Sequence, residues 1–157
     1  MASAKQAVSV ELNASPLEEI SPGLTFQWLF DKRAIGLYAQ HASRQLVDAW
    51  ANKIMELAET WDVNRPYFAL NDFSAKDCVV TPYNQQKNRE LWGMYPHLKS
   101  VSATVVQQNL TMVLTRIFIR TLPNNKNVHL CFSRNDGLLW LKNKVDEHEK
   151  TFASASK

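Results

Sequence analysis

The chain has 157 residues, which is enough for one domain with its own core but not for two. Hydrophobic residues make up 45% of the chain and charged residues 21%, and these proportions exclude collagen-like and wholly disordered proteins. Two cysteines exclude a disulfide framework and a cysteine-rich zinc domain, and the sequence has neither an apolar run of bilayer length nor a signal-peptide core, so we expect a cytoplasmic protein without a membrane span.

The first 22 residues predict a flexible tail, because they are rich in Ala, Ser and Glu and show no sustained period. An alternating stretch at 8–12 could add a short edge strand. Residues 25–30 and 34–40 are rich in aromatic and branched side chains and are separated by a polar stretch. They predict a β-hairpin with a loop longer than two residues, or with a bulge, since no glycine lies in the turn.

Helices and strands alternate through the rest of the chain. A strongly amphipathic helix begins at Ser43 and ends before Asn64-Arg65-Pro66, and a buried strand follows at 66–73. Thr81 and Pro82 are favoured as N-cap and first residue of a helix that should reach about Tyr95. Further elements are expected as a strand at 101–106, a helix at 110–122, a strand at 128–132 and a last helix from 133 that frays over 151–157. The order β-β-α-β-α-β-α-β-α predicts one α/β domain, residues 23–150, with a mixed sheet and flanking helices.

The element order and one local pattern resemble the STAS domain of bacterial anti-sigma-factor antagonists. The strand ends in Asp72-Phe73-Ser74, a short loop follows, and Thr81 falls where that family carries its phosphorylated residue. The resemblance implies a non-enzymatic protein-interaction module in bacterial regulation, with Thr81 or Ser74 phosphorylated by a kinase-like partner. Asp72 and Tyr83 are then candidate contact residues. The family's Asp-Ser-Ser-Gly signature is absent, however, and Pro82 directly follows the candidate acceptor.

Other chemistries have weaker support in the sequence. No histidines, cysteines and carboxylates fall at the spacing of a metal site, and no glycine-rich phosphate loop is present, so we expect neither a metal nor a cofactor. A pI near 8.9 is modest for a nucleic-acid-binding domain. Cys78 lies beside Lys76 but has no histidine nearby in sequence to act as a base. A small ligand-binding domain or enzyme built around residues 72–81 remains an alternative.

The helix expected at 110–122 is apolar around more than half of its circumference. Leu110, Val113, Leu114, Ile117 and Phe118 would form one apolar face, while Met112 and Ile119 lie largely outside it with Arg116 and Arg120. Such a helix is either buried on two sides or used as an interaction surface. We therefore take Arg116, Ile119 and Arg120 as candidate interaction residues. A second alternative is a self-associating structural protein that uses this helix and the edge of the hairpin.

Overall fold

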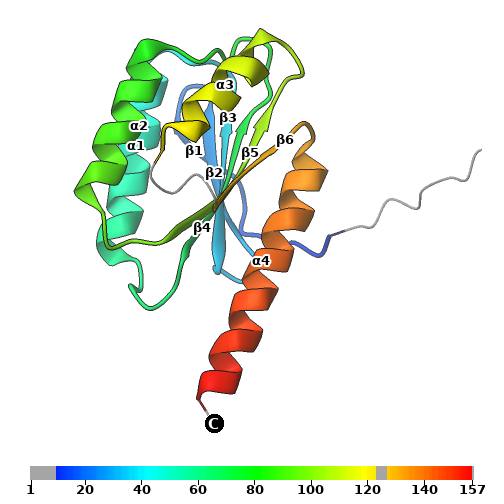
Figure 1. Cartoon of the computed structure of the whole chain (residues 1–157). Coiled ribbons are helices and arrows are strands. Elements are labelled where there is room, and N and C mark those ends of the chain that lie inside the picture. Colours follow the sequence, from blue (N-terminus) through cyan, green and yellow to red (C-terminus); the bar gives the residue numbers. More distant parts are fainter. Residues whose placement is uncertain (1–9, 123–126, 157) are drawn as a thin grey trace, which may run out of the picture.

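The computed structural model describes residues 10–122 and 127–156 as an α/β domain, with a six-stranded mixed sheet and four helices (Figure 1). The strands are β1 (Glu18–Ser21), β2 (Leu24–Leu29), β3 (Ala34–Ala39), β4 (Tyr67–Phe73), β5 (Ser100–Val106) and β6 (Val128–Cys131). The helices are α1 (Arg44–Thr60), α2 (Pro82–Met94), α3 (Leu110–Arg120) and α4 (Arg134–Ala155). The α/β prediction is confirmed.

The strands lie in the sheet in the same order as in the sequence. β1, β2 and β3 pair antiparallel, and β3, β4, β5 and β6 pair parallel. Helices α1, α2 and α3 cover one face of this sheet, and α4 crosses the other (Figure 1). No helix in the described residues is both long enough and apolar enough to cross a membrane.

Each face of the sheet buries a separate core, because successive side chains of a strand point to opposite faces. On β3, Ile35 and Leu37 pack into the core beneath α1, whereas Ala34 and Tyr38 pack into the core beneath α4. Gly137 lets α4 approach closely, since a Cβ there would lie only 2.7 Å from Leu70 Cδ1. The core beneath α4 has one covering helix, whereas the core on the opposite face contains buried side chains of both α1 and α2.

The N-terminal segment is more structured than we expected over residues 10–22. β1 pairs with β2 across a tight turn at Pro22-Gly23, in which Gly23 has a φ of +81°. Upstream of β1, the backbone of Ser15 donates to the Trp28 carbonyl, and the Leu12 carbonyl accepts from the Phe30 amide. The Pro-Gly pair is a strong turn signal, and in the structure it joins β1 to β2 instead of separating a tail from the domain. The expected edge strand at 8–12 falls partly outside the described residues, and residues 10–12 are not in a strand.

The loop between β2 and β3 has four residues, which confirms the expectation of a connection longer than two. Phe30, Asp31 and Lys32 all adopt positive φ angles, of 53°, 57° and 63°. The Arg33 side chain closes the loop by donating from Nε to the Phe30 carbonyl at 2.7 Å.

The expected caps are present in the structure. Ser43 accepts a hydrogen bond from the Leu46 amide at the start of α1, Thr81 caps α2, and Ser133 caps α4. The last helix continues to Ala155, so residues 151–155, which we expected to fray, are helical.

Candidate functional site

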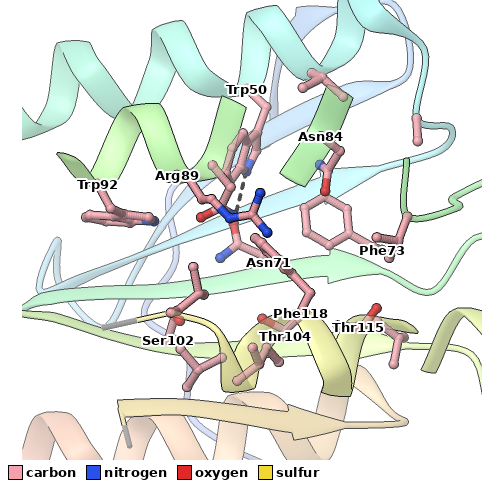
Figure 2. Close-up of a pocket in the computed structure, with 18 of the residues that line it drawn as sticks. Trp50, Asn71, Phe73, Asn84, Arg89, Trp92, Ser102, Thr104, Thr115 and Phe118 are labelled. Atoms are coloured by element: carbon pink, nitrogen blue, oxygen red, sulfur yellow. Dashed lines mark hydrogen bonds between the residues drawn. The ribbon is translucent and has the colours of Figure 1, made fainter. Parts of the chain in front are cut away.

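A pocket of about 600 Å³ lies between the sheet and helices α1, α2 and α3. Its apolar wall includes Leu46 and Trp50 from α1, Trp92 from α2, Phe73 from β4, and Phe118 and Ile119 from α3. Figure 2 shows Trp50 and Trp92 on one side of this space, and Thr115 and Phe118 of α3 on the other. The volume falls in the range of sites that enclose a small organic ligand.

The pocket exists because the helix-facing side of β5 carries small polar residues. Ser100, Ser102 and Thr104 alternate toward the helices, while Ala103 and Val105 pack into the core beneath α4. Serine and threonine fill less space than the leucines and isoleucines found elsewhere in the core, so α3 lies over open volume. The sequence did contain this signal, as a period-two run of hydroxyl residues in a central strand, but we interpreted the segment only as a β-branched strand.

Two polar groups that line the pocket have no hydrogen-bond partner in the described part of the chain. The hydroxyl of Thr115 and the side-chain carbonyl of Asn88 are buried without a hydrogen bond, and Thr115 as a whole is only 6% exposed. Asn71 accepts from Trp50 Nε1 at 3.1 Å, which orients its amide in the pocket (Figure 2). A buried polar group without a partner is costly in a folded protein, so these atoms are suited to bind a ligand or ordered water.

Arg89 places a positive charge at the same pocket. Its guanidinium carbon lies 5.3 Å from the ring centre of Phe118, so the side chain links α2 to α3. Among the described residues it forms no ion pair with a carboxylate. The pocket therefore combines apolar walls, unpaired polar groups and one exposed cation. Sequence reasoning missed Arg89, because nothing in the pattern of α2 distinguishes it from an ordinary surface arginine.

The two candidate phosphate acceptors have different surroundings. Ser74 donates from Oγ to Asp72 Oδ1 at 2.6 Å, so a phosphate on Ser74 would lie against a carboxylate. Thr81 is half-buried, and its Oγ1 accepts from the Asn84 amide at 3.1 Å as the N-cap of α2. Thr81 is thus the more suitable acceptor of the two.

Asp72 is a structural group rather than an exposed contact. It is 3% exposed, and its Oδ2 accepts from Arg134 Nε at 2.7 Å. The Arg134 guanidinium lies 4.4 Å from the ring centre of Tyr38. These contacts tie the end of β4 to the start of α4, which explains the acidic residue at this position without a partner protein.

Tyr83 joins α1 to α2. Its hydroxyl donates to Asp48, and this hydrogen bond lowers the pKa of Asp48 and raises the pKa of Tyr83. Lys87 also reaches Asp48, at 3.4 Å, and the Arg44 guanidinium lies over the tyrosine ring. The residue therefore stabilises the α1–α2 wall of the pocket.

α3 has two different apolar sides, so the prediction of a single apolar face was wrong for Phe118. Phe118 is buried and points toward the pocket with Thr115, whereas Leu110, Val113, Leu114 and Ile117 are exposed. Ile119 is half-buried and lines the pocket, and Arg116 and Arg120 are both exposed. The helix is therefore buried on one side and open on the other.

The two cysteines are buried free thiols. Burial, and then nearby carboxylates, raise the pKa of Cys78 and of Cys131 to about 11. A nucleophilic cysteine needs a lowered pKa, so these environments do not suit one. In the described parts of the chain, no group of three His, Cys, Asp or Glu side chains could hold a metal ion.

Comparison with family models, curated proteins and solved structures found no match. The resemblance to the STAS domain therefore stays a prediction.

Proposed function

We propose that this protein binds a small amphiphilic molecule with an apolar body and an anionic end. The observation that carries the proposal is the pocket of about 600 Å³, with aromatic and aliphatic walls and an arginine without an ion-pair partner among the described residues. The apolar body would contact Trp50, Trp92 and Phe118, and the anionic end would pair with Arg89. The Thr115 hydroxyl and the Asn71 amide are available to a polar group within the ligand.

Several features favour binding over catalysis. The pocket contains one histidine, His41, and one cysteine, Cys78, whose pKa is raised to about 11. Two carboxylates beside the pocket wall are engaged in structural contacts, Asp72 with Arg134 and Asp48 with Tyr83 and Lys87. A ligand-binding site needs only shape, apolar contact and a few placed polar groups, all of which the pocket has.

Fluorescence with cis-parinaric acid tests the proposal directly. Trp50 and Trp92 line the pocket, so excitation energy should pass from tryptophan to the bound polyene. Thr104→Phe should abolish binding by filling the space beside Asn71, while circular dichroism and urea unfolding report an intact fold. Absence of saturable binding to the wild-type chain would refute the proposal.

The role of Arg89 is tested by comparing oleate with oleyl alcohol in competition with parinarate. The wild-type chain should prefer oleate, because only the carboxylate can form a charge-assisted hydrogen bond with the guanidinium. Arg89→Gln should remove that preference, whereas Lys150→Gln, at an exposed position on α4, should keep it. Equal loss in both variants would point to a general charge effect and not to a placed arginine.

The protein-interaction role with a switch at Thr81 is a second proposal. It is favoured by the position of Thr81 at the start of α2, directly after pocket residues Val79 and Val80 and three residues before Asn84. A phosphate there would change the charge at the pocket rim. Thr81→Glu should then alter parinarate affinity or capture of a partner protein, and a variant unchanged in both would remove the switch.

A further inference from the structure

α3 covers the pocket without belonging to either core. The two clusters of buried residues that form the cores include side chains from α1, α2 and α4 but none from α3. Its buried side chains, Thr115 and Phe118, line the pocket instead. Displacing this helix would therefore expose the pocket while leaving both cores packed.

The outer side of α3 is aliphatic and exposed. Leu110 is 71% exposed and Ile117 is 56% exposed, with Val113 and Leu114 between them also open. At about 100° per residue, these four side chains fall within an arc of about 100°. Four adjacent exposed aliphatic side chains form a continuous apolar strip, and such strips are more typical of interaction sites than of an ordinary solvated helix face.

The charges beside this surface are positive. Arg116 and Arg120 are exposed on one flank of the helix and form no ion pair with a described carboxylate. The sequence has no acidic residue between Glu90 and Asp136. An aliphatic strip with basic residues at its side is complementary to the interface of an anionic bilayer, where apolar side chains enter the acyl region and cations meet phosphate groups.

We propose that α3 docks on an anionic membrane surface and that the ligand of the pocket enters from that membrane. Docking would place Leu110, Val113, Leu114 and Ile117 at the boundary between head groups and acyl chains, with Arg116 and Arg120 at the phosphates. The helix that contacts the bilayer is the helix that covers the pocket, so a sparingly soluble amphiphile could reach Arg89 without crossing water. The entry route rests on the proposed function, whereas the docking stands on the surface of α3 alone.

Co-sedimentation with vesicles tests the docking. The full chain should sediment with vesicles of phosphatidylcholine and phosphatidylglycerol, less with phosphatidylcholine alone, and less as salt is raised. Arg116→Gln with Arg120→Gln should weaken binding to the anionic vesicles about thirtyfold. This figure converts the attraction typical of two basic residues near an anionic surface into affinity, at about tenfold per 1.4 kcal/mol.

Leu114→Ser with Ile117→Ser should abolish binding, because it removes the centre of the aliphatic strip. Val63→Ser is the matched control, since Val63 is an exposed aliphatic residue outside α3, and it should bind as the wild type does. Urea unfolding of each variant confirms that it folds. Failure of the wild type to bind anionic vesicles, or full binding by the Leu114/Ile117 variant, overturns the proposal. So does a wild-type dimer that this variant dissociates, because a second copy would then cover the strip.

The two proposals fail separately. Thr104→Phe should dock on vesicles as the wild type does while binding no parinarate. Vesicle binding by a wild-type chain that binds no parinarate would refute the ligand and keep the docking. Parinarate binding by a chain that ignores vesicles would refute the docking and keep the ligand.

Discussion

Replacing either of two neighbouring residues of β5 by valine should change the stability of the chain, but in opposite directions. Ser102 faces the pocket, where extra volume is available, and Ala103 is fully buried beneath α4. Ser102→Val buries added methyl groups at roughly 0.8 kcal/mol each and suits a strand, so we expect stabilisation by about 1 kcal/mol. Ala103→Val forces the same side chain into a filled core, and overpacking of this kind costs about 1–3 kcal/mol.

Urea unfolding measures both effects, since the midpoint reports stability when the slope is unchanged. The two variants should differ by about 2 kcal/mol or more, with the wild type between them. Parinarate binding should weaken in Ser102→Val and persist in Ala103→Val. If Ser102→Val loses as much stability as Ala103→Val, the helix-facing side of β5 is packed, and the reasoning that leads to the pocket is refuted.

Three further predictions concern the groups around this site. Thr81→Ala should destabilise the chain by about 1 kcal/mol in urea unfolding through loss of the N-cap, and an unchanged midpoint would contradict that role. Arg134→Gln should destabilise by about 1–2 kcal/mol, discounted for the half-exposed guanidinium, and should cost much less in an Asp72→Asn background, so additive losses in the double variant would show that the pair is not coupled. The unfolding free energy should fall by about 1 kcal/mol per cysteine between pH 8 and pH 10, because the thiols of Cys78 and Cys131 ionise near pH 8.5–9 when unfolded but near 11 when folded. A variant with alanine at both cysteines should lack that part of the slope.

Much of the fold follows from local signals in the sequence. The amphipathic pattern predicted α1, and the pair Thr81-Pro82 fixed the start of α2 at the residue where the structure has it. These signals act within a few residues, so they are readable without knowing the packing. The strand β1 was missed because four residues with two exposed glutamates carry little hydrophobic pattern, and the pairing with β2 depends on a turn.

The site was harder to predict, because it depends on which elements come together. Asp72 and Arg134 are 62 residues apart, and only the fold shows that they form an ion pair. The helical period correctly placed Leu110, Leu114 and Ile117 on one side of α3, but it could not say that this side faces outward. The residues that form the pocket come from three strands, three helices and the loops between them, and no local pattern joins them.

The sequential strand order has a consequence for how the chain is made. Every strand pairs with its predecessor, so a nascent chain can extend the sheet as each strand and the helical crossover before it leave the ribosome. The face of the sheet opposite α1 is covered later. Its residues Phe68, Leu70 and Val105 pack against Leu141 and Val145 of α4, which is the last helix to be synthesised. Until α4 is complete, a nearly finished sheet presents an uncovered apolar surface, and that interval is when the newborn chain is most vulnerable to aggregation and most dependent on chaperones.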